Sequence, residues 1–279
     1  MREPRASAAD DFIEVDGARL RYRDEGQGFP VLLVHGWALD LDMWQPQVVD
    51  WCGRLRVIRF DRRGFGSSSG SPSLADDARD IESVLRRLNL LRVAILGMSQ
   101  GARGAMHAAA GPLRERVACL VLDGAPFDGR DSGEPEVPLD RYREIARTRG
   151  VDAVRSEWRR HPFANLQTAD RGAHELLSLM TARYPGRDLL SRRQASGVAM
   201  SAADSIDAPT LVLNGAGDTP RRCAMGDALS RALPRAERAL IPDAGHLPNL
   251  DNPAEYNRLV LSFIERHAAV HSPRGPTDA

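Results

Sequence analysis

The amino-acid sequence predicts an α/β fold: a mostly parallel sheet of about eight strands, helices on both faces and one helical insertion. Three observations support this prediction. Short apolar runs recur along the chain, helical patterns separate most of them, and residues 127–203 contain helical patterns only. Alternating strands and helices are typical of parallel sheets joined by right-handed crossovers.

The first two strands are expected to form a hairpin. Residues 12–15 and 19–23 alternate apolar and polar side chains around Asp16-Gly17, and this pair of residues favours a tight turn. Residues 1–10 and 271–279 are small, polar or proline-rich. We therefore expect flexible tails at both ends.

The later strands are expected to lie inside the sheet. Nearly continuous apolar runs indicate strands that are covered on both faces, as in a parallel sheet. Together with the hairpin, these runs bring the expected sheet to about eight strands. The runs are residues 31–34, 57–60, 93–96, 117–122, 211–213 and 239–241.

Two segments carry clear signals for helices that cover the sheet. Ser73 is placed to cap the first helix, and Asp76 and Asp77 would lie in its first turn, where carboxylates favour the helix dipole. Asn252 and Pro253 suit the cap and first position of a closing helix. Side chains at helical spacing are Leu74, Ala78, Ile81, Leu85 and Leu88 in the first, and Tyr256, Leu259, Val260, Phe263, Ile264 and His267 in the second.

One interval interrupts the alternation of strands and helices. Residues 127–203 contain helical patterns, for example at 139–149, 151–160 and 172–184, and no strand pattern. An insertion between two sheet strands would lie over the carboxyl edge of the sheet, where open α/β folds bind ligands. We predict a core domain of residues 11–126 and 204–270, with residues 127–203 as a helical cap or lid.

The composition is that of a globular protein and excludes several classes of function. Apolar residues make up 42% of the chain, charged residues 27%, and the formal net charge is zero. Such a chain lacks the basic footprint of a nucleic-acid-binding protein. All 38 basic residues are arginine, which excludes a phosphate-binding P-loop, a pyridoxal Schiff base and a Ser–Lys dyad.

The sequence also bears on location and partners. The three cysteines are far apart and odd in number, unlike a disulfide framework. No apolar run approaches the roughly 20 residues that span a bilayer, and the first residues lack the apolar stretch of a signal peptide. We expect a cytoplasmic monomer or homodimer whose partner is a small-molecule substrate, without membrane or nucleic-acid contacts.

The strongest local motif is Gly97-Met98-Ser99-Gln100-Gly101. It follows the apolar run at 93–96 and precedes residues 102–110, whose small side chains suit a closely packed helix. A G-x-S-x-G sequence between a strand and a helix forms a sharp turn that exposes the serine, and the glycines leave room for neighbouring backbone. Ser99 is therefore the candidate nucleophile.

A serine nucleophile needs a base whose pKa is near neutral, and histidine supplies one. Among seven histidines, His246 is the best placed, because Asp243-Ala244-Gly245-His246 follows the strand predicted at 239–241. The carboxylate that orients it is expected at another strand end. Asp218 meets this condition and gives the chain order Ser, Asp, His, while Asp123, after the run at 117–122, is the alternative acid.

Five motifs in this order resemble the α/β-hydrolase superfamily over nearly the whole chain. They are His35-Gly36-Trp37, Asp61-Arg62-Arg63-Gly64-Phe65-Gly66-Ser67-Ser68, the serine motif, Gly217-Asp218 and Gly245-His246. The resemblance implies a triad of Ser99, Asp218 and His246 that works without cofactor or metal. It also implies that the backbone N–H groups of Trp37 and Gln100 stabilise the oxyanion, while His35, Asp61 and Gly64 shape loops.

Within the superfamily, the layout resembles 3-oxoadipate enol-lactonases and small carboxylesterases. This implies cleavage of an ester or lactone bond of a small, largely apolar molecule through an acyl-enzyme. Hydrolysis of a C–C bond in a diketone, cofactor-free acyl or peroxide chemistry, and a receptor that retains the triad are alternatives. Candidate pocket residues, for each of which plain packing is the alternative, are Phe127, Trp158, Phe163, Met180, Met200 and Leu247.

Overall fold

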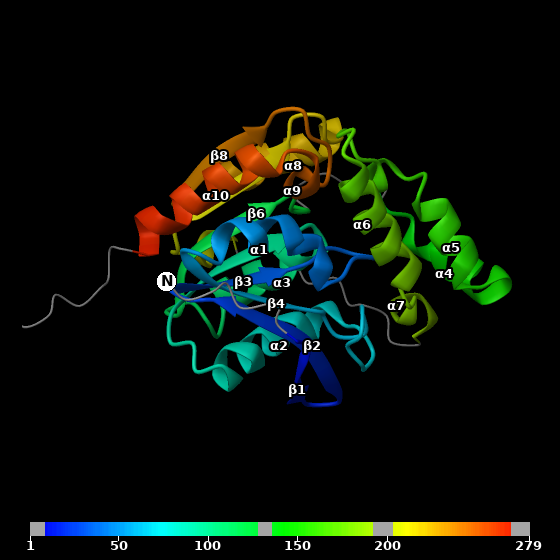
Figure 1. The fold of residues 1–279 in the computed structure, drawn as a ribbon, viewed down its shortest axis with the longest axis horizontal. Coiled ribbons are helices and arrows are strands. Elements are labelled where there is room, and N and C mark those ends of the chain that lie inside the picture. Colours follow the sequence, from blue (N-terminus) through cyan, green and yellow to red (C-terminus); the bar gives the residue numbers. More distant parts are fainter. Residues whose placement is uncertain (1–8, 128–135, 192–202, 269–279) are drawn as a thin grey trace, which may run out of the picture.

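The computed structural model describes residues 9–127, 136–191 and 203–268. Their centre is an eight-stranded sheet with the order β1-β2-β4-β3-β5-β6-β7-β8 (Figure 1). The predicted fold class is confirmed. The strands are β1 (Asp11–Val15), β2 (Ala18–Gly26), β3 (Phe29–Val34), β4 (Leu55–Phe60), β5 (Val93–Met98), β6 (Val117–Asp123), β7 (Thr210–Gly215) and β8 (Ala236–Ile241).

The sheet changes from antiparallel to parallel along its width. The expected hairpin pairs β1 with β2, and β2 pairs antiparallel with β4. All later neighbours are parallel; Leu32 of β3, for example, lies between Ile58 of β4 and Ile95 of β5. The parallel strands from β3 to β7 are almost entirely buried, which explains their continuous apolar sequences.

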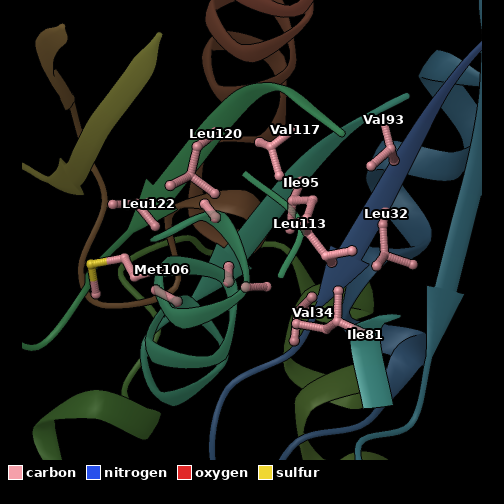
Figure 2. Packing of buried hydrophobic residues seen from close by; sticks show 14 of the residues in the cluster. Leu32, Val34, Ile81, Val93, Ile95, Met106, Leu113, Val117, Leu120 and Leu122 are labelled. Atoms are coloured by element: carbon pink, nitrogen blue, oxygen red, sulfur yellow. The ribbon is translucent and has the colours of Figure 1, made fainter. Parts of the chain in front are cut away.

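Helices cover both faces of this sheet. One face packs against α2 (Leu74–Arg87), α3 (Gln100–Ala110) and α8 (Pro220–Ala232), as Figure 2 illustrates for Ile81 and Met106 over Leu32 and Leu122. The other face packs against η1 (Leu41–Trp44), α1 (Gln45–Trp51) and α10 (Pro253–Ala268). Both helices predicted from their cap signals are present. However, the hydroxyl of Ser73 makes no cap hydrogen bond, whereas Asn252 Oδ1 accepts one from Glu255 N at 3.3 Å.

In its described residues, the insertion between β6 and β7 contains helices joined by short connections, and no strand. Its elements are α4 (Leu139–Arg149), α5 (Val151–Trp158), η2 (Pro162–Ala164), α6 (Arg171–Arg183), α7 (Arg187–Leu190) and η3 (Ala203–Ser205). In Figure 1, α4, α5, α6 and α7 gather at one end of the sheet. Tyr142, Trp158 and Tyr184 of the insertion form an apolar cluster with Trp37 and Phe65 of the core.

Part of the predicted N-terminal tail is anchored to the core. Asp10 forms ion pairs with Arg21 and Arg23 of β2, at 3.0 and 2.7 Å. Residues 1–8 and 269–279, where most of the tail predictions fall, lie outside the described residues. Among the helices that are described, none is both long and apolar enough to cross a membrane.

Candidate active site

Ser99 occupies the turn between β5 and α3, the strand–turn–helix setting expected for its motif. Its backbone has φ 50° and ψ −115°, a conformation that non-glycine residues rarely adopt and that is concentrated at functional sites. The turn packs tightly, since a Cβ atom on Gly101 would lie 2.4 Å from the backbone oxygens of Val34 and His35. This close approach explains why the motif has a glycine at position 101.

His246 and Asp218 lie beside Ser99 although the three are far apart in sequence. His246 Nε2 is 3.2 Å from Ser99 Oγ, and His246 Nδ1 is 3.0 Å from Asp218 Oδ2. The three residues follow β5, β7 and β8, so the carboxyl ends of parallel strands bring them together. With a proton on Nδ1 donated to Asp218, the lone pair of Nε2 faces the serine hydroxyl.

The surroundings favour a charged carboxylate beside a neutral imidazole. Burial raises the pKa of Asp218, but hydrogen bonds from His246, Thr219 N and Asn214 outweigh burial, so its pKa falls below the usual value. Burial lowers the pKa of His246, and the hydrogen bond to Asp218 only partly opposes this. A neutral histidine can accept the proton of the serine.

Asp123, the alternative acid, has a different partner. It is buried at the end of β6, and its Oδ2 accepts a hydrogen bond from the Tyr256 hydroxyl at 3.2 Å. Burial raises its pKa well above the usual value, and the bond from Tyr256 opposes this only in part. Of the two acids considered, the structure brings Asp218 against His246 and Asp123 against Tyr256.

Trp37 and Gln100 lie at the two backbone positions expected to bind an oxyanion. Trp37 follows β3, and Gln100 is the first residue of α3. Within the described residues neither backbone N–H donates a hydrogen bond, although both side chains are held in place. Trp37 Nε1 donates to Asp188 Oδ2 at 2.6 Å, and Arg62 Nη1 donates to Gln100 Oε1 at 2.8 Å.

His35 and Asp61 shape loops, as their sequence motifs suggested. His35 Nε2 accepts a hydrogen bond from Arg62 N at 2.9 Å, and burial lowers the pKa of His35 to about 3. Asp61 accepts hydrogen bonds from Leu41 N and Ser67 N, both at 2.8 Å. The bonds from Arg62 N and Leu41 N connect the loop after β3 with the loop after β4, and the bond from Ser67 N closes the latter loop on itself.

A small cavity adjoins Ser99 and His246. Its volume is about 20 Å³, which is room for about one water molecule. The wall is otherwise apolar or aromatic, because core and insertion both contribute such side chains. It consists of Trp37, Leu39, Met98, Val137, Trp158, Phe163, Ala164, Leu177 and Leu247.

The structure brings only some of the predicted pocket residues to this cavity. Trp158, Phe163 and Leu247 line it. Phe127 follows β6 in the sequence and packs against the core cluster on the face covered by α2 and α3. Met180 lies on the side of α6 that packs against η1, inside the core cluster of the opposite sheet face. Met200 lies outside the described residues.

Several wall residues were missed from the sequence. Met98 belongs to the serine motif and Leu39 closely follows Trp37, so their positions in the sequence were a usable signal. Val137, Ala164 and Leu177 belong to the insertion, where helical periodicity predicts a buried face but not the neighbour it contacts. As for metals, the described residues contain no group of three or more His, Cys, Asp or Glu that could hold one.

The chain resembles known proteins over most of its length. It is 28% identical to a thermophilic esterase from Thermogutta terrifontis (TM-score 0.77, 94% of this chain, all of the other). It is 25% identical to an enol-lactonase from Burkholderia xenovorans (TM-score 0.78, 91% of this chain, all of the other). A non-heme chloroperoxidase from Kitasatospora aureofaciens is 28% identical over 90% of this chain and 98% of its own.

The family comparison agrees with these likenesses. The model of the alpha/beta hydrolase family matches residues 31–259. This range begins in β3 and ends within α10, so it includes Ser99, Asp218 and His246. Family membership supports an enzyme with hydrolase activity. The protein belongs to the alpha/beta hydrolase family.

Proposed function

We propose that this protein is a serine hydrolase that cleaves an ester or lactone bond of a small, largely apolar molecule through an acyl-enzyme. One observation carries the proposal: the His246 ring bridges Ser99 Oγ at 3.2 Å and Asp218 Oδ2 at 3.0 Å. In this order, the imidazole can take the proton of the hydroxyl, which then acts as the nucleophile, and the carboxylate stabilises the imidazolium that forms.

The reaction begins when Ser99 Oγ attacks the carbonyl carbon while His246 Nε2 takes the hydroxyl proton. The backbone N–H groups of Trp37 and Gln100 stabilise the negative charge on the tetrahedral oxygen; each such donor contributes a factor of about 100–1,000 in rate. His246 then returns the proton to the leaving alcohol, which leaves an acyl group on Ser99. A water molecule, deprotonated by His246, releases the acid and restores the serine.

The cavity wall supports an uncharged, compact substrate. Among the described residues that line the space, all except Ser99 and His246 are apolar or aromatic, and burying an ion without a partner there would be costly. The volume of about 20 Å³ has room for about one water molecule, so the side chains of the wall must move outward when a substrate binds, and a compact substrate requires the least movement. The esterase and the enol-lactonase described above agree with ester and lactone substrates.

A second candidate function is cofactor-free acyl and peroxide chemistry on the same residues. The similarity to a non-heme chloroperoxidase over 90% of the chain favours it. In that reaction peroxide, in place of water, would attack the acyl group on Ser99 and release a peracid. Hydrolysis is the first choice because the esterase and enol-lactonase match this chain equally well and water is always present.

A substrate panel tests both candidates. Short p-nitrophenyl esters, lactones, a diketone and acetate with hydrogen peroxide are assayed with wild type and Ser99→Ala. We expect repeated turnover of esters or lactones by wild type and its loss in Ser99→Ala. Peracid formation above hydrolysis would favour the second candidate. Wild-type ester turnover by Ser99→Ala, or a single slow turnover with a large thermal shift, as in a receptor, would contradict the proposal.

A further inference from the structure

A buried ion pair connects the insertion to the loop that carries Asp218. Arg222 lies in the first turn of α8 and is 6% exposed. Its Nε donates to Glu136 Oε2 at 2.8 Å, and the other oxygen of Glu136 accepts a hydrogen bond from Thr219 Oγ1 at 2.6 Å. Glu136 therefore binds two residues that closely follow Asp218 in sequence.

Arg222 of this pair also contacts Phe163, whose ring is stacked on the ring of His246. The rings of Phe163 and His246 are 3.8 Å apart and within 20° of parallel. The guanidinium carbon of Arg222 lies 4.9 Å from the centre of the Phe163 ring, close enough for a cation–π contact. Phe163 thus contacts the imidazole and the arginine at the same time.

Glu136 also fixes the short turn η2 on which Phe163 lies. The backbone oxygen of Glu136 accepts a hydrogen bond from His161 Nε2 at 3.0 Å. The other ring nitrogen of His161 accepts one from Phe163 N at 3.2 Å. A continuous set of hydrogen bonds therefore runs from Glu136 to the backbone of Phe163.

The edge of the imidazole is restricted by Gly124. Arg222 Nη1 donates to Gly124 O at 3.1 Å, and a Cβ atom on Gly124 would lie 3.0 Å from His246 Cε1. This close approach requires the glycine, whose φ is +52°. Arg222 thus holds both groups that confine His246, Phe163 over its face and Gly124 at its edge.

We propose that Arg222 and Glu136 are positioning residues for His246, which keep Phe163 and Gly124 against the imidazole so that Nε2 faces Ser99. The proposal deepens the proposed function and rests on His246 acting as its base. Without the pair, the ring can turn away from Ser99, and small misplacements of a catalytic group cost large factors in rate. The loss should appear in kcat rather than in KM, because neither residue lines the cavity.

The two charges also give the pair a signature that a purely structural role would lack. Arg222 lowers and Glu136 raises the pKa of His246. Among the described residues, the other ionisable groups that interact with the ring are Asp218, which raises that pKa, and His161, whose own pKa is lowered by His246. Removing one charge at a time should therefore move the pKa of His246 in opposite directions.

The experiment compares Glu136→Gln, Arg222→Met and the double variant with wild type in the full chain. The pKa of His246 is measured by NMR from its Cε1–H signal, assigned with His246→Gln, and kcat and KM are measured with the best ester of the panel. We expect kcat to fall about tenfold or more in each single variant, with KM within about threefold. The pKa should fall in Glu136→Gln, rise in Arg222→Met and return toward wild type in the double variant, while kcat stays low.

Two further variants control for loss of folding and for the loss of any ion pair on α8. Asp227→Asn breaks the 2.9 Å pair with Arg238, which does not touch His246, and both readouts should be unchanged. Arg222→Lys keeps the charge without the planar fork, so the pKa should stay near wild type while kcat falls in part. It replaces Arg222→Met if that variant does not fold.

The NMR readout separates this proposal from the proposed function. Unchanged pKa values and kcat within about twofold of wild type in the single variants would overturn the positioning role, and so would shifts of equal sign. Shifts of opposite sign with unchanged kcat would also overturn it, because the pair would then act on charge alone. A wild type that hydrolyses no ester or lactone would contradict the function, whatever the pKa values.

Discussion

The sheet and the helical insertion are held in place by different kinds of contact. Strands from β3 to β7 are packed on both faces by buried apolar side chains. The insertion shares an apolar cluster with the core, but polar contacts also join it, including Trp37 to Asp188, Arg183 to Asp40, and Arg222 to Glu136. Ser99, Asp218 and His246 follow strands of the sheet, whereas residues of the insertion complete the cavity wall.

We therefore expect substitutions in the two regions to affect different properties of the protein. Changes at the strand ends should remove catalysis and leave folding largely intact, because the strands there are fixed by packing. Changes at the anchors of the insertion should alter KM, kcat and stability by smaller factors, because each anchor is one of several.

The strand-end comparison of Asp218 with Asp123 should give the largest difference. In Asp218→Asn, the amide no longer favours the imidazole tautomer with Nε2 free, and kcat should fall by about 10⁴-fold. Asp123→Asn changes a buried carboxyl that contacts Tyr256 and whose pKa burial raises, so kcat should stay within severalfold. Steady-state kinetics on esters measures both. Equal losses in the two variants would mean that Asp123 serves His246.

The pH profile tests the state of the imidazole. His246 must be neutral to accept the serine proton, and burial lowers its pKa below the usual value of about 6.5. Because its pKa is lowered, kcat/KM should begin to fall only below about pH 6.5, by about tenfold per pH unit under the lowered pKa. A midpoint above about 6.5 would contradict a base whose pKa is lowered by burial.

Asp188 anchors the insertion to the loop after β3 that carries Trp37. Its carboxylate accepts hydrogen bonds from Trp37 Nε1 at 2.6 Å and the Tyr184 hydroxyl at 2.5 Å. Asp188→Ala leaves both donors without this acceptor, so we expect about a tenfold loss of kcat/KM and a lower melting temperature. Asp152→Ala, at an exposed carboxylate that pairs with Arg155, is the matched control and should change neither. A wild-type kcat/KM in Asp188→Ala would exclude a role in holding Trp37.

Arg183 should give the smallest effect. Its guanidinium lies 2.8 Å from Asp40 and Asp42, but the side chain is 45% exposed. The carboxylate of Asp40 is buried, but it also accepts a hydrogen bond from Asp42 N. Because the guanidinium is largely solvated, the ion pairs should contribute about 1 kcal/mol, so Arg183→Met should change kcat/KM by less than about threefold. Urea unfolding and steady-state assays measure this. A loss as large as that of Asp188→Ala would show that all polar anchors matter equally.

The sheet could be predicted from the sequence because its signals are local. The apolar runs gave the strands, and the chain order of Ser99, Asp218 and His246 placed their side chains at strand ends. Ser73 is an instructive exception: it precedes α2 as expected, yet its hydroxyl makes no cap hydrogen bond. Position in the chain was predictable here, whereas the bond depends on a side-chain rotamer.

The helices of the insertion could be predicted from the sequence, but the residues with which it lines the cavity could not. Helical periodicity identifies a buried face without its neighbour, so Met180 and Phe127 were assigned to the pocket although they pack in the core. The contacts of Glu136 with Arg222 and of Phe163 with His246 join segments more than 80 residues apart. Such pairs depend on tertiary structure and leave no local signal.

The most direct test of the account is covalent labelling of Ser99. A fluorophosphonate probe reacts with a serine hydroxyl only when a base activates it. The account predicts one adduct in wild type, on the peptide that contains Ser99 by mass spectrometry, none in Ser99→Ala and much slower labelling in His246→Gln. An unlabelled wild type, or an adduct on a different residue, would contradict it.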